Sequence, residues 1–370
     1  RKITMATEKK NGYLILNTGT PDEPTIPALR KYLKEFLSDP DMLDYPSTRP
    51  PELSSGFDVL KNKLASVLRW SIVNLIVVPF RPAKIQHKYQ GIWTKEGSPL
   101  LVNTIKFSNK LKKFTNGNIE IGMRYGNPSI HSAIKKLKEN GTEKLFLVSM
   151  FPQYAEATSG STFTEIERVL KEENYYPELV KIEHFYNEEF YLKSLAKSIT
   201  ESEEYKNSEY LLFSFHGLPV RHLTKADLST SHCQKIENCC EKTSENNEFC
   251  YKSHCVKTIM KLAEIIDPDK PFKVCYQSTF GPEKWIQPNI VDVLEDLSEK
   301  GIKKVSVACP SFTADCLETL EEIAVENHED FEKNGGEYVK LIPSLNDNDD
   351  WVKGFANYLH EKEDQLAIKN

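Results

Sequence analysis

One histidine of this sequence stands where an imidazole could take part in catalysis. His216 directly follows residues 210–215, a strongly apolar run that is typical of a buried strand. A neutral imidazole at the end of such a strand can accept a proton near neutral pH. A lone histidine can equally be structural, so His216 by itself leaves both explanations open.

Four acidic side chains form a second group that could do chemistry. Glu318, Glu322 and Glu326 recur every four residues, which places them along one face of an expected helix, and Asp315 lies one turn earlier. Like charges at this spacing destabilise a helix by roughly a few tenths of a kcal/mol per pair. Stacked carboxylates that lead into a pocket could carry divalent metal ions in and protons out. The alternative is an acidic face that is simply solvated.

Five of the eight cysteines fall within residues 233–255, more than random placement would put there. They are Cys233, Cys239, Cys240, Cys250 and Cys255. Four thiolates can hold a two-iron two-sulfur (2Fe-2S) cluster, whereas these spacings do not match the short Cys-x2-Cys knuckles of structural zinc. Three explanations stay open for this cysteine-rich segment: an iron–sulfur cluster, a zinc site that also uses His232 or His254, and no metal.

Short apolar runs that alternate with amphipathic stretches predict a parallel α/β fold. The expected strands are residues 13–16, 119–121, 144–148, 210–215, 272–275 and 304–308. Near-continuous apolar strands of this kind are covered by helices on both faces. Helices are expected over residues 129–139 and 289–300, which end at Gly141 and Gly301. These two helix–strand units match at one constant offset, which indicates an internal duplication.

The duplication divides the chain into two halves and a tail. We expect a first half over residues 11–180, a second half over residues 181–345 and a C-terminal helix within residues 346–370. Residues 39–98 resemble an insertion in the first half, because they are rich in proline and unusually apolar over residues 71–80. This segment is either an ordinary buried helix or an apolar lip that lies beside a pocket or touches a bilayer.

Composition excludes several classes of protein. The chain has 370 residues and a net charge of −6, so it lacks the basic surface of a nucleic-acid-binding protein. A mean hydropathy of −0.49 excludes an integral membrane protein. No secretory signal opens the sequence, which predicts a cytoplasmic protein. Whether the apolar lip also makes peripheral contact with the inner membrane stays open. No Gly-x-Gly-x-x-Gly or Gly-Lys-Ser/Thr loop is present to hold a nucleotide phosphate. The sequence makes no prediction of oligomeric state.

The residues around the histidine and the acidic row resemble the ferrochelatase family, the terminal enzymes of haem synthesis. The resemblance rests on residues 212–219 together with residues 311–323. Further motifs follow in family order at residues 16–21, 84–86, 97–99, 122–125, 152–154, 277–278, 285 and 341–346. The resemblance covers about residues 11–360 and implies two similar Rossmann-like halves, each with a parallel sheet flanked by helices, and an active-site cleft between them.

The resemblance also implies the reaction. Ferrochelatases insert ferrous iron into a tetrapyrrole, which loses two pyrrole protons, and we favour protoporphyrin IX over coproporphyrin as the substrate that becomes haem. The family's histidine matches His216, which is implied as proton acceptor or metal contact, and its paired glutamate matches Glu318. Glu322 and Glu326 continue the acidic row. Which residue handles protons and which handles iron stays open.

Seven residues are implied as contacts of the porphyrin. They are Thr18, Arg124, Tyr125, Tyr154, Ser278, Trp285 and Phe312. A planar guanidinium suits a propionate carboxylate, and the aromatic rings suit a flat macrocycle. The position of Thr18 differs among family members, so a direct metal role is not expected there.

The resemblance allows a 2Fe-2S cluster, since some ferrochelatases have one. Cys240, Cys250 and Cys255 are the preferred ligands, with Cys233 ahead of Cys239 for the fourth. Two other functions remain possible for the whole chain: a non-catalytic carrier of a tetrapyrrole or metal, and a chelatase for another porphyrin or metal.

Overall fold

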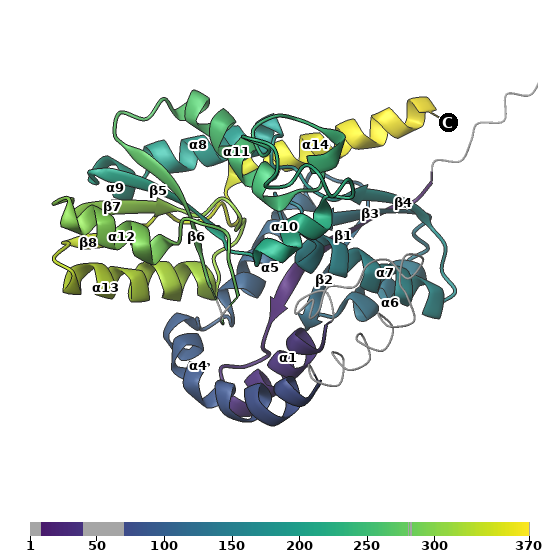
Figure 1. Ribbon diagram of the computed structural model, residues 1–370. Coiled ribbons are helices and arrows are strands. Elements are labelled where there is room, and N and C mark those ends of the chain that lie inside the picture. Colours follow the sequence, from purple (N-terminus) through teal and green to yellow (C-terminus); the bar gives the residue numbers. More distant parts are fainter. Residues whose placement is uncertain (1–8, 40–69, 280, 282, 370) are drawn as a thin grey trace, which may run out of the picture.

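The protein contains two parallel β-sheets of the same topology (Figure 1). The computed structural model describes residues 9–39, 70–279, 281 and 283–369. Within these residues there are two four-stranded sheets, with strand orders β2-β1-β3-β4 and β6-β5-β7-β8, and all paired strands are parallel. The two orders match strand for strand, and helices flank both sheets. The predicted fold class is therefore confirmed.

The strands of the first sheet are β1 (Asn11–Thr20), β2 (Asn118–Gly126), β3 (Lys144–Ser149) and β4 (Glu178–Ile182). The strands of the second sheet are β5 (Tyr210–His216), β6 (Phe272–Gln277), β7 (Lys304–Ala308) and β8 (Tyr338–Leu341). Up to the end of the first sheet the helical segments are α1 (Ile26–Ser38), η2 (Ile72–Val77), α4 (Val78–Ile92), α5 (Pro99–Leu111), α6 (Ile130–Glu139), η3 (Glu156–Gly160) and α7 (Ser161–Glu172). Those that follow are α8 (Glu189–Glu201), α9 (Glu203–Lys206), α10 (Val220–Ala226), η4 (Glu245–Asn247), α11 (Tyr251–Ile266), α12 (Ile290–Glu299), η5 (Glu318–Asn327), α13 (His328–Lys333) and α14 (Asp349–Lys369).

Equivalent helices of the two halves begin and end in the same way. Ser129 and Asn289 precede α6 and α12, and the side chain of each accepts a hydrogen bond from a backbone N–H of the first turn. Gly141 and Gly301 follow the two helices with φ values of 70° and 83°, in the left-handed region that glycine adopts without strain. These matched ends support the predicted duplication.

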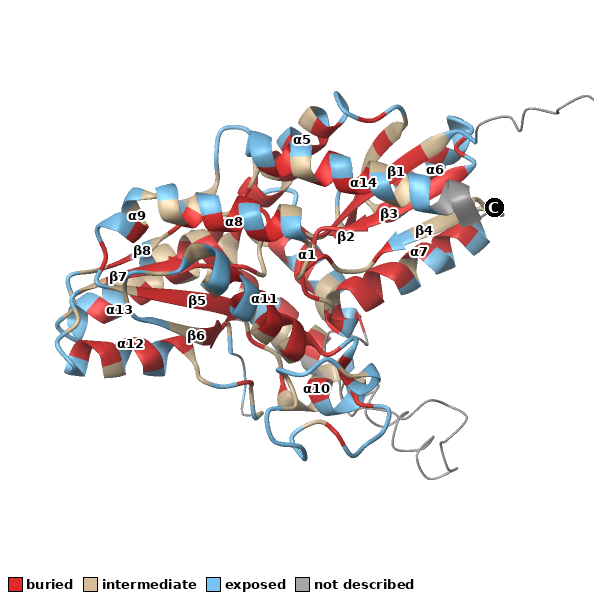
Figure 2. Ribbon diagram, turned by 90° about the horizontal axis from the view of Figure 1, so that it is seen from above, coloured by how far each residue is buried: buried red, intermediate tan, exposed pale blue. Residues whose placement is uncertain are grey.

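One extensive core joins the two halves. It includes Tyr13 and Phe146 from the first sheet, Phe213 from the second, and Trp351 and Phe355 from α14. In Figure 2 the inner strands β1, β3, β5 and β7 are mostly buried, and the helices are buried on the faces that cover the sheets. The shared core fixes the carboxyl ends of the strands in both sheets relative to each other.

Two edge strands were not expected from the sequence. β4 and β8 lie at the ends of their sheets, and each has an exposed lysine, Lys181 or Lys340, among its apolar residues. The boundary expected between residues 180 and 181 falls within β4, so we propose that the first half extends through that strand. The expected C-terminal helix corresponds to α14.

The insertion-like region 39–98 is described only in part, because residues 40–69 lie outside the described residues. From Trp70 onward the chain is helical through η2 and α4, with Val73 and Val78 buried. Trp70, Leu75 and Phe80 are 62%, 62% and 65% exposed. The segment is therefore a helix with an apolar outer face as well as a buried one. Among the described residues, no helix is both long enough and apolar enough to cross a bilayer.

Candidate active site

His216 ends the central strand β5, with its side chain held in one tautomer. Its Nδ1 lies 2.6 Å from the carbonyl oxygen of Gly217. Because a carbonyl oxygen can only accept, Nδ1 carries the proton and Nε2 keeps its lone pair. The ring lies 6.3 Å, centroid to centroid, from the ring of Phe312. In the neutral imidazole this bond leaves the lone pair on Nε2, and the role of His216 as proton acceptor or metal contact stays a prediction.

The acidic row lies on η5, whose conformation differs from the expected α-helix. Residues Glu318–Asn327 form a π-helix, in which backbone hydrogen bonds join residues i and i+5. The fully buried Gln277, which pairs with His216 in the β5–β6 ladder, donates from Nε2 to the carbonyl oxygen of Glu318 at 2.7 Å. The end of β6 is thus attached to the first turn of η5.

Glu322 is the acidic side chain that connects the row to His216. The backbone N–H of Ser278 donates to its Oε1 at 2.6 Å, and the Ser278 hydroxyl donates to its Oε2. Burial raises the pKa of Glu322, and the Ser278 bonds and the nearby His216 partly offset that increase, while Glu318 adds to it. The Glu322 carboxyl is therefore within electrostatic range of both His216 and Glu318. The predicted meeting of the His216 ring with Glu318 stays a prediction.

Glu318 faces the first half of the chain. Its charge adds to the effect of burial in raising the pKa values of Tyr89 on α4 and Tyr32 on α1. It also interacts with the buried thiol of Cys316, whose pKa is raised chiefly by burial. Glu318 thus lies between the second sheet and the helices α1 and α4.

The other two acidic candidates have partners of their own. Glu326 forms an ion pair with Lys88 of α4. Asp315 is buried, and its oxygens accept hydrogen bonds from the Thr319 hydroxyl at 3.0 Å, the Ser344 backbone N–H at 3.2 Å and the Asn346 side chain at 2.8 Å. These bonds attach the start of η5 to the turn after β8, which is a structural role. The metal path that we propose does not include Asp315.

Arg124 and Tyr125 meet an internal carboxylate rather than solvent. Arg124 donates to Asp39 at 2.6 Å and to the Ser161 hydroxyl at 2.8 Å, and the Tyr125 hydroxyl donates to the same oxygen of Asp39 at 2.6 Å. The side chain of Asp39 is only 2% exposed. Burial and the neighbouring Asp39 raise the pKa of Tyr125. The structure therefore places an acidic side chain where the sequence predicted a propionate.

The remaining porphyrin candidates are spread over several surfaces. Thr18 is half-buried near the end of β1. Tyr154 packs edge-on against Phe249, and its backbone N–H donates to His254, so it borders the cysteine-rich segment. Trp285 is half-buried and lines a cavity of about 390 Å3 in the loop that precedes α12. Phe312 and Ser278, by contrast, lie beside His216 and Glu322.

Sequence reasoning missed Gln277 and Asp39. Gln277 follows an apolar strand, as His216 does, and that parallel could have identified it. Asp39 gives no signal in the sequence, because Arg124 and Ser161 are distant along the chain and only the fold brings them to it.

The cysteine-rich segment brings four thiols near one another, of which Cys250 is buried and the other three are half-buried. Cys239 and Cys240 have sulfur atoms 3.8 Å apart, and Cys240 forms a hydrogen bond with Cys250 that lowers the pKa of Cys250. Cys233 is in electrostatic range of Cys239 and Cys250. Cys255 is fully buried, and its thiol interacts with Tyr251 and is in electrostatic range of Cys250. Across the described ranges, no three His, Cys, Asp or Glu side chains are arranged to hold a metal ion.

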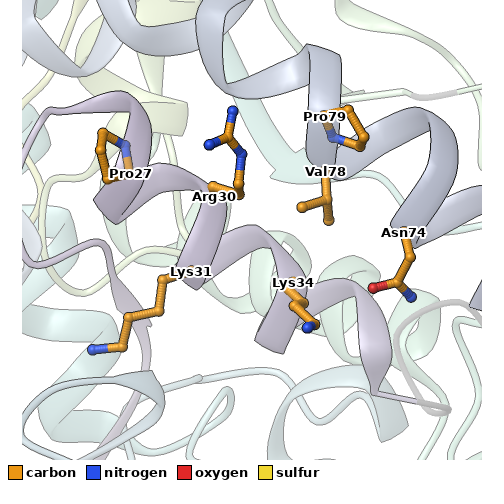
Figure 3. Close-up of a pocket in the computed structure, with 7 residues that line it drawn as sticks. All are labelled: Pro27, Arg30, Lys31, Lys34, Asn74, Val78 and Pro79. Atoms are coloured by element: carbon orange, nitrogen blue, oxygen red, sulfur yellow. The ribbon is translucent and has the colours of Figure 1, made fainter.

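A cavity of about 560 Å3 lies between α1 and the helical segment η2–α4 (Figure 3). It is lined by Pro27, Arg30, Lys31, Lys34, Asn74, Val78 and Pro79. Its charged side chains are all basic, although Lys31 also pairs with Asp22 at 3.0 Å. His216 and Glu318 line neither this cavity nor the one at Trp285, so the cleft implied between the halves stays a prediction.

Comparison with known proteins places this chain in a family. The sequence model of the ferrochelatase family matches residues 51–363. A ferrochelatase of Coxiella burnetii (strain Dugway 5J108-111) is 39% identical over 357 residues, which cover 96% of this chain and 94% of that protein. A ferrochelatase of Bdellovibrio bacteriovorus is 35% identical, covering 94% and 98%. SirB from Bacillus subtilis, solved with Fe3+, has a TM-score of 0.52 at 11% identity, covers 95% of each chain, and supports the fold alone. The chain therefore belongs to the ferrochelatase family.

Proposed function

We propose that this protein is a ferrochelatase, which inserts ferrous iron into protoporphyrin IX to form protohaem and releases two protons. The observation that carries the proposal is that the strand end beside His216 is bonded to the acidic row: Gln277, the ladder partner of His216, donates to the carbonyl oxygen of Glu318, and Ser278 donates to the carboxylate of Glu322. Ligands of open parallel sheets bind at this edge. An imidazole with a free lone pair beside two carboxylates supplies both a proton acceptor and a negative charge for a divalent cation.

The geometry supports different roles for the three side chains. Nε2 of His216 accepts a proton from a pyrrole nitrogen, since Nδ1 already carries one. Glu322 accepts protons from this region more readily than an exposed glutamate, because burial raises its pKa. Glu318 attracts ferrous iron and stabilises the imidazolium. Glu326 continues the acidic path toward the surface. The replacement of two N–H bonds by bonds to one Fe2+ balances the charge.

The macrocycle would pack on Phe312 and lie near Ser278, which border this group. Thr18, Trp285 and Tyr154 are proposed as more distant contacts. Arg124 and Tyr125 already donate to Asp39, so either residue could bind a propionate only by sharing or giving up its bond to that carboxylate. We therefore propose that the two residues stabilise the wall of the site.

Anaerobic turnover tests this function directly. Purified protein is given ferrous iron and either protoporphyrin IX or coproporphyrin III, and porphyrin fluorescence is followed as the metal enters. We expect fluorescence to fall with both iron and protein present, and faster with protoporphyrin IX. Preferential loss of coproporphyrin fluorescence would reassign the substrate, and no loss with either would refute the enzyme.

The hydroxyl of Ser278 should set the acid limit of activity. Ser278→Ala removes a donor to the charged form of Glu322, so the pKa of Glu322 rises further and a larger fraction is protonated at a given acid pH. We expect the acid limb of the kcat profile to move to higher pH, with the rate near neutral pH little changed. Thr279→Ala removes an adjacent hydroxyl that bonds to Asn289 instead, and should leave the profile in place. An unshifted profile in Ser278→Ala would remove Glu322 from proton transfer.

We further propose that the four gathered thiols, Cys233, Cys239, Cys240 and Cys250, are the ligands of a 2Fe-2S cluster. Their thiolate chemistry fits such a cluster, although the described conformation does not close around a metal. No step of iron insertion is assigned to it. Anaerobically purified protein should then absorb in the visible and contain about two iron atoms bound outside the active site. A colourless, iron-free and fully active sample would refute a required cluster.

Finally, we propose a cytoplasmic protein that touches an anionic phospholipid bilayer through η2–α4 and α1. Trp70, Leu75 and Phe80 supply exposed apolar contacts. Arg30 and Lys34, beside the basic cavity, are exposed and make no ion pair with any residue that the structure describes. A basic face in a chain of net charge −6 complements an anionic surface.

Vesicle sedimentation tests this contact. We expect binding to phosphatidylglycerol-containing vesicles and little binding to pure phosphatidylcholine. Lys34→Gln should weaken binding about five-fold, because one basic residue near such a surface contributes about 1 kcal/mol, and Phe80→Ser should weaken it as well. Tyr176→Ser, which alters an exposed aromatic residue elsewhere, is the control. Equal or absent binding to the two kinds of vesicle would refute the contact.

A further inference from the structure

Tyr251 lies between the cysteine-rich segment and the end of β5. It is the first residue of α11 and is only 7% exposed. Its hydroxyl donates to the backbone carbonyl oxygen of His216 at 2.8 Å and lies 3.1 Å from the hydroxyl oxygen of Ser311. The phenol therefore touches the peptide of His216 without approaching the imidazole.

Ser311 completes a closed set of hydrogen bonds around His216. Its hydroxyl oxygen accepts from the backbone N–H of His216 at 3.3 Å. Tyr251 and Ser311 thus bond to each other and to opposite sides of the same residue. Because this residue ends a strand, these bonds fix the direction in which its side chain leaves the backbone. A buried hydroxyl without a polar partner would cost free energy, and the Tyr251 hydroxyl has two such partners here. Phenylalanine at this position would fill the same space but could make neither bond.

Two cysteines also lie next to Tyr251. Cys250 immediately precedes it and stands at the N-terminus of α11, where its thiol bonds with Cys240. Cys255 lies one helical turn later, and its thiol interacts with the phenol of Tyr251. A change at either cysteine would move the first turn of α11 or the phenol itself, and Tyr251 would pass that movement to His216.

We propose that Tyr251 is a positioning residue for His216 and that it makes the orientation of this imidazole depend on Cys250 and Cys255. That this orientation matters for turnover rests on the proposed iron insertion. That the orientation of the His216 ring depends on the two cysteines does not rest on it. Histidine ring signals in nuclear magnetic resonance spectra therefore provide a readout in the metal-free protein, and the His216→Ala spectrum assigns the signal.

The first experiment replaces Tyr251 with phenylalanine, which keeps the ring and removes the hydroxyl. We expect the His216 ring signal to shift and kcat to fall about 10- to 100-fold with little change in KM for the porphyrin, as for the loss of a partner that orients a functional histidine. Tyr205→Phe is the matched control, because Tyr205 is also 7% exposed and loses one hydrogen bond, to Asp269, away from the site. Ser311→Ala should reproduce the effect of Tyr251→Phe. An unmoved ring signal in both variants would refute the positioning role.

The second experiment tests the path from the cysteines. Cys255→Ala should shift the His216 ring signal in the wild-type background and shift it much less in the Y251F background. Cys275→Ala removes another fully buried thiol and should leave the signal unchanged in both. Equal shifts in the two backgrounds would show that Tyr251 does not carry the effect. If the protein proves inactive in iron insertion, these spectra still decide the structural dependence, so the two failures are distinguishable.

Discussion

Replacing His216 with alanine should abolish measurable iron insertion while the protein still binds porphyrin. General acid–base groups contribute about 10²- to 10⁴-fold to rates, and this imidazole is the one with a free Nε2 beside Glu322. Porphyrin binding should persist, because packing against Phe312 and the rest of the site does not need the ring. Anaerobic turnover gives the rate, and quenching of protein fluorescence gives the porphyrin dissociation constant.

The control for this variant is His131→Ala. His131 lies on the surface of α6 and pairs with Glu173 at 2.9 Å, so its loss should leave the rate unchanged. Unchanged insertion by the His216 variant would refute the assigned role and favour a carrier of tetrapyrrole or metal. Loss of porphyrin binding together with insertion would instead assign the imidazole to binding.

Glu318→Gln should reduce kcat by about 100-fold. It should also raise KM for ferrous iron, so that the rate falls even further at low iron concentration. The change is nearly isosteric and removes the charge that faces α1 and α4, and with it the attraction of Fe2+ and the stabilisation of the imidazolium that we propose for this carboxylate. Titration of ferrous iron in the anaerobic assay separates the effect on kcat from that on KM for the metal.

Glu321→Gln provides a matched control on the same helix. Glu321 is buried and lies against α4 at Gly91, away from the row that includes Glu318 and Glu322. We expect this variant to retain most of its activity. Full activity in Glu318→Gln would remove the carboxylate from the mechanism, and equal losses in the two variants would indicate damage to η5 rather than loss of a specific charge.

The sheets could be predicted from the sequence to the extent that their strands are continuously apolar. β1, β3, β5 and β7 are covered on both faces, so each is a short run of buried residues that stands out from its surroundings. β4 and β8 lie at sheet edges and include exposed lysines, which removes that pattern. Edge strands of this kind form because a neighbouring strand offers backbone hydrogen bonds, and their own composition does not reveal them.

The site was predictable in its residue types but not in its details. His216 ends one apolar strand and the acidic row follows its neighbour β7, so the adjacency of these strands in one sheet is what predicts that the two groups lie close together. The spacing of four did not predict the π-helical form of η5, nor the hydrogen bonds that Gln277 and Ser278 make to it. Asp315 was expected in the metal path, and only the distant turn at Asn346 reveals its structural role.

The cysteines show the same limit. Their clustering in the sequence indicated a shared site, and the fold does bring Cys233, Cys239, Cys240 and Cys250 together. The sequence preferred Cys255 as a ligand, and the structure places its thiol in the core beside Tyr251, within electrostatic range of Cys250. Spacing along the chain cannot show how deeply each thiol is buried.

The matched strand orders make the end of β1 the counterpart of the end of β5. Thr18-Gly19-Thr20-Pro21 there corresponds to His216-Gly217-Leu218-Pro219, so a hydroxyl occupies in one repeat the position that the imidazole occupies in the other. A protein with two identical repeats would have the same side chain at both positions, and so two identical bases for a symmetrical ligand. This chain has the same strand order in both repeats but unlike side chains at the two strand ends, so under the proposed function only the second repeat would present a proton acceptor to a flat ring.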